Sequence, residues 1–175
     1  NSLAAMRYAQ SLGCMASEMD IYCTKDDKII VYHANSKGLI NGLCPWLCTL
    51  EELRLAGKLA NGEHIPTLEE LLEVTMVPGS CTKIHFDPKL LKTETAIYRD
   101  AAIRSCELTC KIVEDYGAEN WVEFIMIGDE EVTSKVHKTI KSYGINVCWT
   151  KNSRAADVKK KGYADWVNVS CTGGM

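Results

Sequence analysis

Two carboxylates with one residue between them, Glu18 and Asp20, are the first candidates for a catalytic or metal-binding role. The segment around them, residues 15–22, is strand-like. Because alternate strand residues point to the same face, both carboxylates project together. Two such carboxylates repel each other unless a cation lies between them, and oxygen ligands of this kind suit Mg²⁺ or Ca²⁺. His33 ends the next strand-like segment, and a histidine side chain can give and take protons in a reaction. The spacing therefore predicts metal-assisted chemistry with a proton carrier nearby.

Strand-like and helical segments alternate along the chain and would position these residues. The predicted strands cover residues 15–22, 28–33, 83–87, 122–127, 145–150 and 166–169. The predicted helices cover residues 2–12, 93–116, 130–143 and 153–161, with two short helices that begin after the N-capping residues Thr49 and Thr67. Strands that alternate with helices predict a parallel sheet covered by helices, either a barrel or an open doubly wound sheet. The sequence contains no glycine-rich phosphate loop, so any phosphate would be bound by side chains and metal.

The composition is that of an ordinary globular domain, and we expect one domain over residues 1–175. Of its 175 residues, 46% are hydrophobic and 25% are charged, which is typical of a domain with a core. The net charge is -3, and no basic block would follow a phosphate backbone, so nucleic acid is not an expected partner. No apolar run approaches the roughly 20 residues that cross a bilayer, so no membrane span is expected.

The chain has nine cysteines, an odd number without the regular spacing of a disulfide framework. Cys44 and Cys48 are four residues apart, as are Cys106 and Cys110, but there is no Cys-x-x-Cys motif of the kind found in zinc sites. We expect reduced, mostly buried thiols with a structural role. This usage favours a cytoplasmic location.

Several motifs follow one another in the order in which they occur in the glycerophosphodiester phosphodiesterase family. They are Asn1-Ser2-Leu3-Ala4-Ala5, Gly13 followed by Glu18-Met19-Asp20, Thr24-Lys25-Asp26, Ile30-Val31-Tyr32-His33, Thr49-Leu50-Glu51-Glu52-Leu53, Ile65-Pro66-Thr67-Leu68-Glu69-Glu70 and Trp149-Thr150-Lys151-Asn152. The chain resembles this family from Asn1 to about Cys171. The resemblance implies an α/β fold of the TIM-type (β/α)₈ barrel class, with its site at the C-terminal ends of the strands. It also implies a phosphoric diester hydrolase that converts a small glycerophosphodiester to glycerol 3-phosphate and an alcohol.

The resemblance implies a divalent metal, Mg²⁺ or Ca²⁺, held by Glu18, Asp20 and a third carboxylate. Residues 82–89 resemble the family's fourth strand, where an acid and a lysine stand two residues apart. This alignment gives Asp87 as the third ligand and Lys89 as a catalytic and phosphate-binding residue. The family usually has glutamate at the position of Asp87. The aspartate side chain is shorter than that of glutamate by one C–C bond. A shifted alignment would instead place His85 and Asp87 at the two positions and lose the lysine.

The resemblance also assigns two residues outside the metal set. His33 resembles the family's second histidine, which protonates the leaving alcohol. The family has an acid after this histidine, whereas this chain has Ala34, so we expect its ring to be less well fixed. Trp149 resembles a tryptophan of the seventh strand that contacts substrate at the pocket mouth.

Two departures from the family pattern bear on activity. The family's first strand carries a His-Arg-Gly motif before a Glu-Asn pair, and residues 1–175 begin at that asparagine, Asn1. Residues 128–144 have room for one helix where the family has a strand and a helix, so we expect six or seven strands and an incomplete barrel with unpaired edges. The alternatives to a hydrolase are a catalytically impaired protein that binds metal or phosphate, a related lyase that forms a cyclic phosphate, and a structural protein with solvated carboxylates.

Overall fold

Six strands form one sheet in the order β2-β1-β3-β4-β5-β6 in the computed structural model, which describes residues 1–89, 96–126, 130–149, 155–162 and 164–167. The strands are β1 (Ala16–Cys23), β2 (Ile29–Val31), β3 (Lys83–Pro88), β4 (Val122–Met126), β5 (Asn146–Trp149) and β6 (Trp166–Val167). The helices are α1 (Leu3–Ser11), α2 (Leu50–Ala56), α3 (Leu68–Thr75), α4 (Ala96–Tyr116), α5 (Glu130–Ser142) and α6 (Ala155–Lys161), with 3₁₀ turns η1 (Pro45–Leu47) and η2 (Glu119–Trp121). The predicted elements are therefore present, although predicted residues 93–95, 127, 150, 153–154 and 168–169 lie outside the described part.

All neighbouring strands pair in parallel except β2, which is antiparallel to β1 and lies at one edge. The prediction of a parallel sheet is wrong for this strand. Only residues 24–28 connect β1 to β2, and a parallel pair needs a crossover of a dozen or more residues. Asp27 takes a positive φ of 60° in this turn, a conformation that aspartate tolerates better than most residues.

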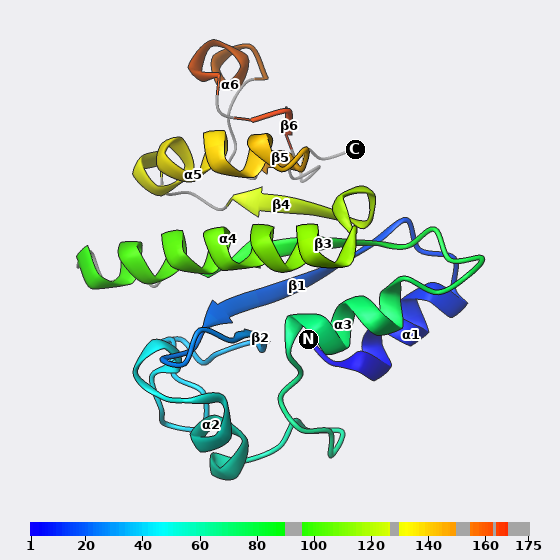
Figure 1. Cartoon of the computed structure of the whole chain (residues 1–175), viewed down its shortest axis with the longest axis vertical. Helices are drawn as coiled ribbons and strands as arrows, with labels where there is room; N and C mark the ends of the chain where they lie inside the picture. Colours follow the sequence, from blue (N-terminus) through cyan, green and yellow to red (C-terminus); the bar gives the residue numbers. More distant parts are fainter. Residues whose placement is uncertain (90–95, 127–129, 150–154, 163, 168–175) are drawn as a thin grey trace, which may run out of the picture.

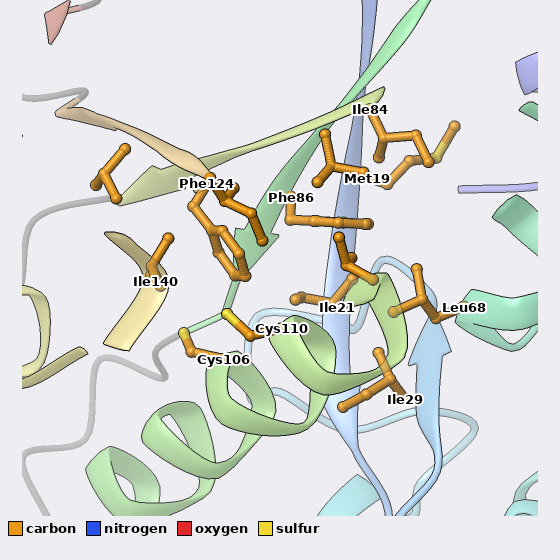
Figure 2. Close-up of a cluster of buried hydrophobic side chains, with 14 of the residues drawn as sticks. Met19, Ile21, Ile29, Leu68, Ile84, Phe86, Cys106, Cys110, Phe124 and Ile140 are labelled. Carbon is orange, nitrogen blue, oxygen red and sulfur yellow. The ribbon is translucent and has the colours of Figure 1, made fainter. Parts of the chain in front are cut away.

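The helices α3, α4 and α5 cover one face of the sheet, and Figure 1 shows α4 and α5 in front of the strands. Alternate strand residues such as Met19, Ile21 and Phe86 are buried on this face. The rings of Phe86 and Phe124 lie 5.6 Å apart between their centroids, and α4 contributes the buried Cys106 and Cys110 to the same cluster (Figure 2). Burying each such side chain contributes about 1.5–3 kcal/mol. This apolar face leaves the intervening residues of β1 and β3 to point the other way.

Two short helices begin at the threonines that the sequence marked as caps. Thr49 accepts a hydrogen bond from the backbone N–H of Glu52 at 3.2 Å, and the Glu52 carboxylate accepts one from the N–H of Thr49 at 2.7 Å. Thr67 and Glu70 form the same reciprocal capping box at the start of α3. Both predicted helix starts are confirmed, and both lie within the long connection between β2 and β3.

The sheet does not close within the described residues, since β2 and β6 each pair with a strand on one side only, and β2 adds only an isolated bridge between Ile30 and Thr67. The adjacent strands β4 and β5 are connected through α5. None of the helices in the described ranges is long and apolar enough to cross a membrane. The eight cysteines in these ranges form no disulfide bond with one another, and four of them are buried.

Candidate metal and phosphate site

Three carboxylates meet on the sheet face opposite the hydrophobic core. Glu18 and Asp20 lie on β1 and Asp87 lies on β3, and the parallel register places Asp20 directly beside Asp87. One oxygen from each carboxylate lies within 4.8 Å of the others. Oxygen ligands sit about 2.0–2.6 Å from Mg²⁺ or Ca²⁺, so oxygens at this spacing can contact one cation. The structure thus brings together the three predicted ligands.

Lys89 reaches into this carboxylate cluster from the residue after β3. Its Nζ lies 2.6 Å from Asp20 Oδ1 and 3.8 Å from Glu18 Oε1, and it donates a hydrogen bond to Asp87 Oδ2. The side chains of Asp20 and Asp87 are each only 1% exposed. A buried carboxylate needs a nearby positive charge. Lys89 supplies that charge to both buried aspartates.

One ammonium does not balance three carboxylates, and the pKa values of the cluster reflect this. Burial, and then the hydrogen bond to Asp20, raise the pKa of Glu18 to about 7. Burial also raises the pKa of Asp87, against the opposing effect of Lys89. Burial alone would raise the pKa of Asp20, but its hydrogen bonds with Lys89 and Glu18 bring that pKa below its usual value. Burial would lower the pKa of Lys89, but its hydrogen bonds to both aspartates raise it overall.

The donor set fits a hard divalent cation. Asp87 Oδ1 is buried and has no hydrogen-bond partner in the described part of the chain. Burial, and then the neighbouring Asp20, raise the pKa of Glu18 and so disfavour its charged form. An added cation would supply both a partner for this oxygen and the missing positive charge.

His33 lies at the edge of the same cluster. Its Nδ1 is 2.6 Å from Asp20 Oδ2, and because an ionised carboxylate can only accept, Nδ1 is the donor and Nε2 is left for another group. The side chain is 75% exposed. Asp20, rather than a residue that follows the histidine, contacts the ring, and the expectation of a less well fixed ring after Ala34 stays a prediction.

Asn1 is a site residue that sequence reasoning did not assign. Its amide nitrogen donates to Asp20 Oδ2 at 2.9 Å, and its amide oxygen accepts from the backbone N–H of Asp20 at 2.7 Å. These bonds fix the carboxylate that also contacts Lys89 and His33. Asn1 belongs to the first motif of the family resemblance, but only the fold shows that it reaches Asp20.

Two predicted site residues lie apart from the cluster. His85 is level with Glu18 across the strand pair, but its Nε2 faces Glu123 Oε2 at 3.8 Å and its ring lies 5.6 Å from that of Trp166. Trp149 is 3% exposed and belongs to the helix-covered core. Trp149 lies on the same face of β5 as Val147, which is in the same core, and Cys148 between them lies on the other face. The structure therefore does not bring Trp149 to the carboxylates.

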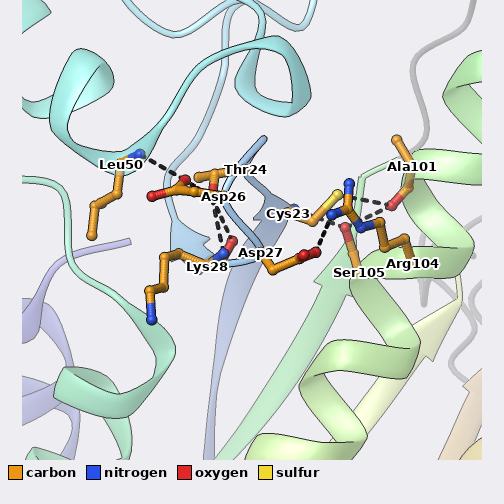
Figure 3. Close-up of polar contacts among 9 residues, drawn as sticks. All are labelled: Cys23, Thr24, Asp26, Asp27, Lys28, Leu50, Ala101, Arg104 and Ser105. Carbon is orange, nitrogen blue, oxygen red and sulfur yellow. Dashed lines mark hydrogen bonds and ion pairs between the residues drawn. The ribbon is translucent and has the colours of Figure 1, made fainter.

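Polar contacts hold the end of β1 beyond the acidic pair (Figure 3). The backbone N–H of Cys23 donates to the Ser105 hydroxyl on α4 at 2.9 Å. Asp26 accepts from the Thr24 hydroxyl at 2.7 Å and from the backbone N–H of Leu50 at 3.0 Å. Asp27 and Arg104 form an ion pair on the other side of the turn. These contacts position the strand that carries Glu18 and Asp20.

Residues 1–173 match the family model described as the glycerophosphoryl diester phosphodiesterase family. The chain belongs to this family. A glycerophosphodiester phosphodiesterase from Caldanaerobacter subterraneus subsp. tengcongensis is 32% identical over 87 residues, 42% of this chain and 34% of that protein. A glycerophosphodiester phosphodiesterase structure from Parabacteroides distasonis superimposes with a TM-score of 0.78 at 21% identity, over 97% of this chain and 66% of that chain.

A third relative is an Oleispira antarctica phosphodiesterase, whose structure is a complex with the product sn-glycerol-3-phosphate. It matches with a TM-score of 0.54 at 14% identity, over 96% of this chain and 77% of that chain. These comparisons confirm the family resemblance and the TIM-type fold, of which the described strands form an open, incomplete barrel. The matched region is about one third of the curated relative and about two thirds of the Parabacteroides structure.

Proposed function

We propose that this chain carries a metal-dependent phosphodiesterase site that hydrolyses glycerophosphodiesters to glycerol 3-phosphate and an alcohol. The observation that carries the proposal is the convergence of three carboxylates, one ammonium and one imidazole on a single point of the sheet. Family membership supports the reaction class, and the glycerol 3-phosphate bound to the Oleispira antarctica relative supports the product. The small-molecule diester is the proposed partner.

Glu18, Asp20 and Asp87 would hold the divalent cation, Mg²⁺ or Ca²⁺, which would supply positive charge to the phosphoryl oxygens. Lys89 lies among the same carboxylates and would donate a hydrogen bond to a phosphoryl oxygen as negative charge develops on it. Asp20 and Asp87 are buried, and charges interact more strongly away from bulk water. The charge interactions of the site are therefore strong.

His33 would provide the proton for the leaving alcohol. Water adds to phosphorus and releases a proton to the solvent, the bond from phosphorus to the alcohol oxygen breaks, and the protonated ring gives its Nε2 proton to that oxygen. Asp20 would hold the ring through Nδ1 and stabilise its charged form. Asn1 would position Asp20 for this task through its two hydrogen bonds.

Release of glycerol 3-phosphate from a glycerophosphodiester tests the proposal. We expect release that needs Mg²⁺ or Ca²⁺, stops with EDTA, and falls by at least about 100-fold in Asp20→Asn, as for the loss of a metal ligand or its support. Glu114→Gln, an exposed carboxylate on α4, is the matched control and should keep full activity. Release that survives both EDTA and Asp20→Asn would overturn the proposal.

A catalytically impaired metal- or phosphate-binding protein is the second candidate. It is favoured by Lys89, which already compensates Asp20 and Asp87, and by the short arm of Asp87. Calorimetry with Mg²⁺ or Ca²⁺ beside the turnover assay separates the two functions, because binding without product supports the second. Phosphorus NMR would reveal the cyclic phosphate expected of a lyase.

A further inference from the structure

An open cavity of about 380 Å³ lies beside His33, and nothing above assigns it a role. We infer that this cavity receives the alcohol part of the diester and selects uncharged, hydroxyl-bearing alcohols over alcohols that carry a quaternary ammonium group. The inference rests on the proposed function, because it takes His33 as the proton donor to the leaving alcohol.

The cavity lies next to the proposed proton donor, His33. Asp20 occupies Nδ1, so Nε2 is the nitrogen left for another group, and His33 is one of the residues that line the cavity. The leaving oxygen must approach this ring to take its proton, within about 3 Å of the nitrogen. The rest of the alcohol would then lie between His33 and the facing wall, residues 59–61.

The facing wall is fixed to the start of α1. Glu63 accepts hydrogen bonds from the backbone N–H groups of Leu3 and Ala4 at 2.9 and 3.0 Å. Its backbone oxygen accepts from the N–H of Leu59 at 2.9 Å, and its N–H donates to the Asn61 side chain at 3.2 Å. These bonds join residues 59–61 to the segment that carries Asn1, so the cavity is preformed rather than built from a free loop.

The described lining contains polar, uncharged side chains and no carboxylate. Beside His33, the described residues that line it include Asn1, Ser2, Tyr32 and Asn61, which have polar, uncharged side chains. The Glu63 carboxylate is engaged by the two N–H groups of α1. A quaternary ammonium binds best to several aromatic faces with a negative charge, whereas this cavity has one tyrosine. Amide and hydroxyl groups are the natural partners of a polyol.

Two substrates that release the same product test the inference. We expect the full chain, assayed with Ca²⁺, to prefer glycerophosphoglycerol over glycerophosphocholine by about fivefold in kcat/KM, the factor for roughly one net hydrogen bond. Asn61→Asp keeps the oxygen that accepts from Glu63 and adds a negative charge to the cavity. This change should reduce the preference about threefold, as expected for one exposed charge pair.

Asn146→Asp is the matched control, because it makes the same change in charge on β5, where Asn146 accepts from Lys141 at 3.0 Å. It should leave the preference unchanged. A wild-type preference for glycerophosphocholine, or equal effects of the two variants, would overturn the inference. If neither diester is hydrolysed, the proposed function fails separately. The unhydrolysed diesters then serve as ligands in calorimetry, where the same ratio is expected in affinity, and equal affinities would overturn the inference.

Discussion

Replacing Lys89 by methionine should expose how the carboxylate cluster depends on positive charge. Lys89 is 26% exposed and contacts two carboxylates that are each 1% exposed. Removing one partner of a buried ion pair costs about 3–5 kcal/mol, because the other charge is left uncompensated. We therefore expect Lys89→Met to lower the free energy of unfolding of the metal-free chain by about 3 kcal/mol, the low end for a partly exposed lysine.

A divalent cation should restore this loss. A ligand that binds only the folded chain stabilises it by about 2.7 kcal/mol at 100 times its dissociation constant. Urea denaturation of wild type and Lys89→Met, each with EDTA and with Ca²⁺, measures this. The stabilisation by Ca²⁺ should be larger in Lys89→Met than in wild type, since the cation then compensates charge that no side chain does.

Lys83→Met, on the same strand, is the control. Lys83 pairs with Glu123 at 3.1 Å and is 41% exposed, so its loss should cost less than about 1 kcal/mol with no special response to Ca²⁺. Two results would contradict the predicted role of Lys89. One is a metal-free Lys89→Met chain as stable as wild type, and the other is equal stabilisation of both chains by Ca²⁺.

Three further predictions follow from individual contacts. Metal binding should weaken as the pH falls below about 7, by up to tenfold per pH unit, because the cation needs ionised Glu18 and its pKa in the metal-free chain is about 7; calorimetry from pH 5.5 to 8 checks this, and a flat profile contradicts it. Thr67→Ala should lower the free energy of unfolding by about 1 kcal/mol through loss of the α3 cap, with Thr67→Ser as the tolerated control in urea denaturation. Ser105→Ala should cost about 1–3 kcal/mol, because the buried N–H of Cys23 loses its acceptor; an unchanged midpoint would show that water replaces the hydroxyl.

Most helices and strands could be predicted because their formation depends on residues close together in the sequence. The capping boxes at Thr49 and Thr67 need only a threonine and a glutamate three residues later. The acidic pair was predicted from strand alternation alone, and Asp87 from the resemblance of its strand. The structure places all three carboxylates together because β1 and β3 are neighbours in the sheet.

What the sequence did not predict depends on distant parts of the chain. The bond from Asn1 to Asp20 joins residues 19 positions apart, and no local pattern marks it. The side to which Trp149 points depends on which face of β5 the helices cover, and a four-residue strand with three buried positions carries no clear alternation. His33 is contacted across the sheet edge by Asp20 rather than by a residue that follows it.

The most direct test of the central claim is calorimetric titration of the chain with Mg²⁺ or Ca²⁺. The claim is that Glu18, Asp20 and Asp87 together bind one divalent cation. We expect one ion per chain, with affinity reduced at least about tenfold in Asp87→Asn. Asp115→Asn, an exposed carboxylate at the end of α4, should bind as wild type does. Absence of binding to the wild-type chain, or equal affinity of wild type and Asp87→Asn, would contradict the claim.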